Sequence, residues 1–207
     1  MEHTSAVELE HFPAVLTDDG TLAYGGSQDW YRDPWHRLAG CAATSGANLA
    51  AYYRVGVSPD AETDAGEAVY SLERFRALMD VMFGYMRPGV RGFPHADKYQ
   101  EKFLAYAAAN GARFTTGLVE GWADWREPFA CLQDEIRAGR PVQLLILEHA
   151  ARQIEDNTWH WMTVTGFDPE TDELLISNYA KREWMPAPVV FDPAEENTVR
   201  LVLFQKS

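Results

Sequence analysis

Two cysteines are the first residues in this chain of 207 amino acids whose chemistry stands out. Cys41 follows a glycine in the stretch LAGCAATSGANLAAYY, and the pattern after it predicts a helix that begins at the cysteine. The free N–H groups and the dipole at a helix N-terminus stabilise an anion, so this position is expected to lower the pKa of a thiol. Cys131 lies off the apolar stripe of its own predicted helix, and we interpret it as a structural thiol.

A nucleophilic thiol also needs a base, a group that orients the base, and an oxyanion donor. His160 opens a β-branched strand in TWHWMTVTGFD, and a strand gives a base a rigid mount. Asn178 lies in the next predicted strand, where sheet propensity alone does not favour an asparagine. Gln28, which precedes Cys41, can donate an amide hydrogen to an oxyanion beside the N–H of Cys41.

The register of these two strands sets a geometric condition. A symmetric hairpin that pairs Asp168 with Glu173 would place His160 and Asn178 on opposite faces of the sheet. Only a loop of odd length or a one-residue bulge brings both side chains to one face. The hypothesis therefore requires such an irregularity.

Tryptophans flank these candidate residues. Trp30, Trp35, Trp159 and Trp161 are expected to wall a substrate groove that suits extended peptide or acyl-amide ligands. His36 lies in DPWHRLAG, which we interpret as a loop, where it either lines the cleft or is solvated. The chain has no HExxH, no cysteine cluster at ligand spacing, no GxGxxG and no P-loop, so neither a metal nor a cofactor is expected.

The elements that must position these residues change character along the chain. Apolar periodicity predicts helices over residues 41–53, 69–86, 95–112 and 127–139. β-rich runs predict strands over residues 21–24, 141–147, 159–167, 173–180, 187–191 and 198–204. Residues 60–68 are expected to be a solvated linker. Helices followed by antiparallel strands predict an α+β fold, here one domain over 1–207 with a helical lobe at about 69–110 and a β-rich half at about 141–204.

Composition excludes several classes of function. The net charge of −13 disfavours nucleic acid and anionic membranes as partners, so binding to either is not expected. The N-terminus MEHTSAVELEHF lacks the apolar core of a secretory signal, and the longest strongly apolar run, VQLLIL, is too short to span a bilayer. We therefore expect a cytoplasmic protein.

The order Gln, Cys, His and Asn, with the sequence around each residue, resembles the papain-like cysteine peptidase superfamily. The resemblance lies in SQDW…GCAATSGANLAAYY, IRAGRPVQLLIL and HWMTVTGFDPETDELLISN. It points to the branch that contains the bacteriocin-processing, double-glycine leader peptidases and their stand-alone relatives. It covers roughly half of the chain, and the segment from Pro59 to Arg113 lies outside it. The chain reads Gly-Cys-Ala-Ala at the nucleophile, where many relatives read Gly-Cys-Gly-Pro.

The resemblance implies a papain-like fold, with a central helix headed by Cys41 packed on an antiparallel sheet. It implies that Cys41 is the nucleophile, His160 the general base and acid, Asn178 the orienting residue and Gln28 the oxyanion donor. The expected activity is hydrolysis of a peptide or amide bond through a thioester. Two alternatives stay open: an acyltransferase with the same triad, and a non-catalytic binding module. Because no transporter domain follows, a leader peptidase coupled to export is not expected.

Overall fold

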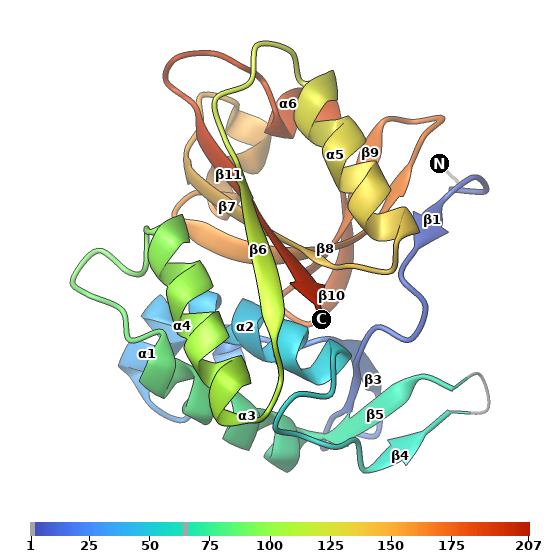
Figure 1. Ribbon diagram of the computed structural model, residues 1–207, viewed down its shortest axis with the longest axis vertical. Helices are drawn as coiled ribbons and strands as arrows, with labels where there is room; N and C mark the ends of the chain where they lie inside the picture. The colour runs from blue at the N-terminus through green and yellow to red at the C-terminus, as the bar shows by residue number, and fades with distance from the viewer. Residues whose placement is uncertain (1–2, 64–65) are drawn as a thin grey trace.

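The computed structural model describes residues 3–63 and 66–207, which form helices and two β-sheets (Figure 1). The helices differ widely in length. They are η1 (Gln28–Trp30), α1 (Pro34–Ala39), α2 (Cys41–Tyr52), α3 (Leu72–Tyr85), α4 (Ala96–Ala109), α5 (Arg126–Arg137), η2 (Arg152–Asn157) and α6 (Ala187–Val190), the two η elements being 3-10 helices. Among the described residues, none of these helices is both long and apolar enough to cross a membrane.

The larger sheet is antiparallel throughout and has the strand order β10-β9-β8-β7-β11-β6, with β1 paired to β8. Its strands are β1 (Val7–Glu8), β6 (Phe114–Val119), β7 (Val142–Glu148), β8 (His160–Asp168), β9 (Glu173–Asn178), β10 (Lys181–Pro186) and β11 (Thr198–Lys206). The smaller sheet has the order β3-β2-β5-β4. Its strands are β2 (Ala14–Leu16), β3 (Leu22–Tyr24), β4 (Ala61–Glu62) and β5 (Ala68–Ser71).

Helices cover both faces of the larger sheet (Figure 1). Leu145 and Phe204 pack into a cluster with α2, α3 and α4, whereas Leu144 and Ile146 pack into a second cluster with α5 and α6. A strand that is buried on both faces favours apolar residues on both sides of the sheet. This explains why residues 144–147 of β7 form a continuous apolar run, whereas the buried Gln143 before them accepts hydrogen bonds from the hydroxyls of Tyr99 and Thr163.

α2 is the buried centre of the first cluster. Every residue from Cys41 to Ala51 is buried, and the small side chains of this stretch let the helix pack closely on β8 and α3. Its polar side chains have partners: the hydroxyl of Ser45 lies 2.9 Å from that of Tyr99, and Oδ1 of Asn48 accepts the N–H of Gly26 at 2.8 Å. These hydrogen bonds satisfy groups that would otherwise be costly to bury.

The structure confirms the α+β class and corrects several predicted elements. Residues 187–190 form helix α6 and not a strand, and DPWHRLAG contains helix α1 and not a loop. Within the predicted linker 60–68, residues 61–62 form β4 and residue 68 begins β5, while residues 64–65 lie outside the described residues. Strands β6 and β10 were not predicted. In α1, Asp33 caps the helix by accepting from two backbone N–H groups, and Pro34 occupies the first helical position.

Candidate active site

Cys41 is the first residue of α2. Gly40 precedes it as the N-cap, and a Cβ at Gly40 would overlap the carbonyl oxygen of His36 and the ring of Tyr31, so only glycine fits there. The first N–H groups of a helix have no intrahelical partner and point at its N-terminus. The predicted helix start at Cys41 is therefore confirmed.

Burial dominates the electrostatics of this thiol. The sequence led us to expect a lowered pKa, but burial raises the pKa of Cys41, and the N–H groups of Trp161, Ala42 and Cys41 itself only partly oppose this. Desolvation penalises the thiolate more than the helix terminus stabilises it. Burial also lowers the pKa of His160, because the imidazolium loses its contact with water. Both groups are thus favoured in their neutral forms.

His160 and Asn178 form a direct hydrogen bond, with 2.8 Å between Nε2 and Oδ1. The pairing of β8 with β9 explains it: Asp168 pairs with Glu173, but the register shifts by one residue between Val164 and Gly166. Thr165 is the extra residue of this bulge, and beyond it the side chains of positions 160 and 178 share a face. The irregularity that the sequence required is present. Within residues 3–63 and 66–207, no hydrogen bond involves Nδ1 of His160, which leaves this nitrogen available for another partner.

Two further side chains hold Asn178, and the sequence analysis did not identify either. Its Nδ2 donates to Oδ1 of Asn157 at 3.0 Å and to Oε2 of Glu183 at 3.1 Å. Because the amide nitrogen is engaged in this way, the amide oxygen must face His160. Asn157 lies in η2, and Glu183 lies in the unpredicted strand β10, which explains why no sequence pattern pointed to them.

Tyr179 covers the imidazole. Its ring stacks on that of His160 with 5.2 Å between centroids and 7° between planes. Tyr179 and Ala180 form the two-residue turn between β9 and β10, with φ values of 46° and 62°. Positive φ at both positions is strained for residues other than glycine, and such strain is frequent at functional sites.

Gln28 lies in η1 and is buried. Its Nε2 donates to the carbonyl oxygen of Arg37 at 2.7 Å, while its Oε1 is buried without a hydrogen-bond partner among the described residues. An amide nitrogen carries two hydrogens, so one remains available after the bond to Arg37. This arrangement leaves Gln28 able to donate toward Cys41.

A small cavity joins the four residues. Gln28, Cys41, His160 and Asn178 all line it, although they come from η1, α2, β8 and β9. A thiol, an imidazole oriented by an amide, and a second amide donor thus share one space. Such a set can generate a nucleophile, accept its proton and stabilise an oxyanion.

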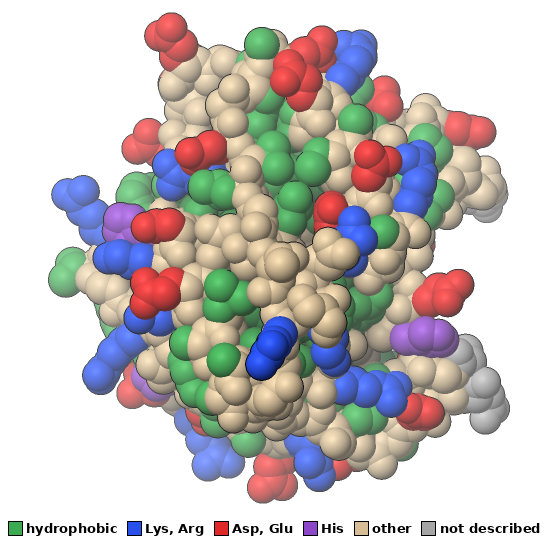
Figure 2. Space-filling view, in the orientation of Figure 1, with side chains coloured by type: hydrophobic (Ala, Val, Ile, Leu, Met, Phe, Trp, Pro, Cys, Tyr) green, Lys and Arg blue, Asp and Glu red, His purple; other side chains and the backbone are tan. Residues whose placement is uncertain are grey.

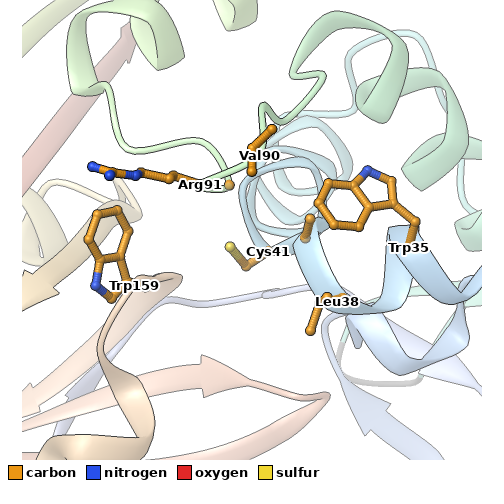
Figure 3. Close-up of a pocket in the computed structure, with 8 residues that line it drawn as sticks. Trp35, Leu38, Cys41, Val90, Arg91 and Trp159 are labelled. Carbon is orange, nitrogen blue, oxygen red and sulfur yellow. The ribbon is translucent and has the colours of Figure 1, made fainter.

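A larger, open pocket of about 390 Å³ adjoins this cavity, because Cys41 lines both. Figure 3 shows Trp159 and Arg91 on one side of Cys41 and Trp35 and Leu38 on the other. The rim is apolar and exposed, with Leu38 74% and Val90 97% accessible to solvent. Exposed apolar side chains around a pocket mark a binding surface.

Not all of the predicted aromatic residues reach this pocket. Trp35 and Trp159 line it, whereas Trp30 lines a separate pocket and packs edge-on against Phe75. Trp161 is buried against the ring of Tyr99, and its Nε1 donates to a backbone carbonyl. It lines the small cavity and is not among the residues that line the larger pocket.

The remaining histidine and cysteine candidates have other environments. His36 stacks on Phe83 at 3.7 Å and is only partly buried, so neither of the two proposed environments describes it. Cys131 lies half-buried in α5, where burial, Glu135 and Asp134 raise the pKa of its thiol. A thiol whose pKa is raised by burial and by neighbouring carboxylates forms little thiolate, which is consistent with a structural role.

Comparison with protein families matches residues 27–200 to the family described as "Peptidase_C39 like family". The matched range contains Gln28, Cys41, His160 and Asn178, together with both walls of the larger pocket. A search among curated proteins finds no match to the chain.

Proposed function

The chain belongs to the Peptidase_C39 like family, whose fold is papain-like, and from this premise we propose that it is a thiol-dependent peptidase or amide hydrolase. Membership supports a function of the cysteine peptidase type. The finer assignment rests on one observation, which is the hydrogen bond between His160 and Asn178 beside the helix-terminal thiol of Cys41. Cys41 is the nucleophile in this proposal, His160 the base and acid, and Asn178 the orienting residue.

The first half of the reaction forms a thioester. The thiol proton of Cys41 moves to Nδ1 of His160 as the sulfur attacks the carbonyl carbon of the amide. Because both residues are favoured neutral, we expect proton transfer to accompany attack, with no stable ion pair before it. His160 then gives this proton to the leaving nitrogen, the carbon–nitrogen bond breaks, and the amine departs.

The negative charge on the carbonyl oxygen of the tetrahedral species needs donors that are already in place. The backbone N–H of Cys41 and the free N–H of Gln28 are the proposed pair. Since Nε2 of Gln28 is held by the carbonyl of Arg37, its position is fixed before substrate arrives. Fixed donors avoid reorganisation during the reaction and so lower the barrier.

The second half consumes water. His160 takes a proton from water, the resulting hydroxide attacks the thioester carbon, and the acid leaves as Cys41 recovers its proton from His160. Water must therefore enter the site. The exposed rim of the larger pocket supports hydrolysis, because a dedicated transferase gains from a site that excludes water.

The test is acylation of the intact protein by a library of peptide p-nitroanilides. Wild-type protein and Cys131→Ala should release p-nitroaniline, whereas Cys41→Ala should release none above background. Mass spectrometry of quenched reactions should detect an acyl group on Cys41. If the Cys41→Ala variant released p-nitroaniline as fast as the wild-type protein, the result would contradict Cys41 as the nucleophile.

The same assay separates the alternatives when an amine acceptor is added at millimolar concentration. A dominant carboxylic acid product supports the hydrolase, and a dominant amide product identifies an acyltransferase. If no substrate acylates Cys41, the chain is a binding module and the proposal fails.

A further inference from the structure

A second pocket of about 440 Å³ continues from the pocket beside Cys41. Arg91, Gly92 and Trp159 line both, so a ligand can extend from one into the other without leaving the surface. The second pocket lies along the loop between α3 and α4 and reaches the first turn of α4. Nothing in the proposed chemistry uses it.

The polar side chains that line this second pocket are all basic in type. They are Arg87, Arg91, His95 and Lys98. No carboxylate lines it, and none of the four forms an ion pair in the described part of the chain. Asp97, the neighbour of Lys98 in α4, is exposed and lies outside the lining.

The local excess of cations contrasts with the rest of the molecule. The chain carries 31 acidic residues against 18 lysines and arginines, so unpaired cations on its surface have many possible partners. Figure 2 shows several blue side chains along the left edge, with red ones among them, where Figure 1 draws the loop between α3 and α4. A cluster of unpaired cations within an acidic surface focuses its field on anions in solution.

The loop that carries Arg91 is held in place. Gly89 and Gly92 exchange two backbone hydrogen bonds of 2.9 and 3.1 Å, which pin the two-residue tip of Val90 and Arg91. At the base of the tip, the carbonyl of Phe93 accepts the Nε1–H of Trp161 at 2.7 Å. The guanidinium of Arg91 is therefore presented from a tethered loop, which lowers the entropic cost of binding a ligand.

From this geometry we infer that the basic pocket is a specificity subsite for an anionic group on the substrate. The inference rests on the proposed function: the acyl part of the amide would lie against Trp35 and Trp159, and an anionic side chain would reach Arg91 and Lys98. Carboxylate and phosphate share the required chemistry, because both accept hydrogen bonds from guanidinium and ammonium groups. Apolar contact beside the reacting bond and a charge beyond it together define the substrate class.

The test measures binding and not turnover, so it stays informative if the proposed reaction is wrong. Cys41→Ala protein is titrated by calorimetry with four peptides, acetyl-Xaa-Leu-Ala-methylamide, in which Xaa is glutamate, phosphoserine, glutamine or lysine. We expect glutamate or phosphoserine to bind about three- to tenfold more tightly than glutamine, and lysine more weakly, because each exposed ion pair contributes modestly. Whichever of the glutamate and phosphoserine peptides binds more tightly shows whether the site prefers a carboxylate or a phosphate.

Charge variants assign the effect to the pocket. Arg91→Gln combined with Lys98→Gln should abolish the preference for the anionic peptides over the glutamine peptide. Lys102→Gln, which removes a cation from the same helix outside the pocket, is the matched control and should keep the preference.

Three outcomes would overturn the subsite. These are equal binding of glutamate and glutamine peptides, a preference that survives the double variant, and no binding of any peptide at about 1 mM. If the peptides show an anionic preference but no substrate acylates Cys41 in the wild-type protein, the subsite is supported and the hydrolase is rejected.

Discussion

The thiol of Cys41 and the imidazole of His160 are both buried, and burial disfavours the charged form of each. Their pKa values therefore move apart, the histidine downward and the cysteine upward. A neutral pair that exchanges its proton only during attack is the resting state that follows. This differs from the picture that a helix N-terminus alone suggests, in which the thiol ionises first.

The first prediction concerns the pH dependence of kcat/KM. Protonation of His160 removes the base, and since its pKa is lowered, the acid limb should lie below the ordinary histidine value of 6.5. Deprotonation of Cys41 beside a neutral imidazole removes the transferable proton, and since its pKa is raised, the alkaline limb should lie above 9.0. Steady-state rates on one p-nitroanilide across the pH range check both limbs. An acid limb at or above 6.5 would contradict the assignment.

The second prediction concerns Glu183, which positions Asn178 and whose charge raises the pKa of His160. Glu183→Gln keeps an oxygen that can accept from Asn178 and removes the charge. We expect kcat to fall by a small factor, about two- to fivefold, with the acid limb moved to lower pH. Glu183→Ala also removes one of the two acceptors that hold the amide nitrogen of Asn178 and should lower kcat by about tenfold or more.

The measurement compares kcat, KM and the acid limb of both variants with the wild-type protein. A merely structural glutamate would change stability and leave the pH profile in place, so an unmoved acid limb in Glu183→Gln would reject this role.

At the scale of elements, the site depends on one bulge and one turn. The bulge at Thr165 brings His160 and Asn178 to the same face of the sheet. The turn of Tyr179 and Ala180 then reverses the chain so that β10 returns Glu183 to Asn178. Both features place the candidate side chains through their backbone geometry, and the turn also brings the ring of Tyr179 onto His160.

The third prediction tests the strain in this turn. Ala180 has φ of 62°, and a left-handed conformation costs a non-glycine residue about 1–2 kcal/mol, of which the flexibility of an unfolded glycine cancels about 0.5–1. Ala180→Gly should therefore raise the free energy of unfolding by about 0.5–1 kcal/mol, measured by urea denaturation, with activity unchanged.

Tyr179→Gly is the matched variant at the other turn position. It relieves the same strain but removes the ring that stacks on His160. We expect stability to change little and kcat to fall, because water then reaches the hydrogen bond between His160 and Asn178. Equal activity of the two glycine variants would show that the ring has no such role.

Sequence patterns predicted the helices and strands that bury one face or both faces in the core. The apolar stripes of α3, α4 and α5 and the β-branched runs of β7, β8 and β11 all appear where periodicity placed them. β10 escaped prediction because KREWMP is a charged strand at the edge of the sheet, and because its turn contains neither glycine nor asparagine. α6 escaped because tertiary packing overrides the β propensity of a four-residue run.

The site was predictable to a similar depth. Cys41, His160 and Asn178 could be proposed from residue type and order, and the need for a bulge followed from strand register. The position of the bulge could not be derived from the sequence, although a glycine inside a strand, here Gly166, is a frequent sign of a bulge. Asn157, Tyr179 and Glu183 act through contacts between elements, and no local pattern reports such contacts.

At the scale of the whole molecule, two charge distributions oppose each other. The net charge of −13 makes the folded chain repel itself, whereas Arg87, Arg91 and Lys98 in the second pocket attract anions. Salt screens both, since the Debye length falls from about 30 Å at 10 mM to about 10 Å at 100 mM. The same change in solution should therefore act on stability and on substrate binding with opposite signs.

The last prediction follows from this opposition. Between about 10 and 300 mM KCl, the urea midpoint of the wild-type protein should rise, because screening relieves self-repulsion while exposed ion pairs such as Arg54–Glu62 contribute at most about 1 kcal/mol each. Over the same range, the affinity of Cys41→Ala for acetyl-Glu-Leu-Ala-methylamide should fall, and that for the glutamine peptide should stay constant. Denaturation and calorimetry at matched salt concentrations measure the two effects. If the affinity for both peptides changes equally, salt acts on the fold or the apolar contacts, and the basic pocket does not select anions.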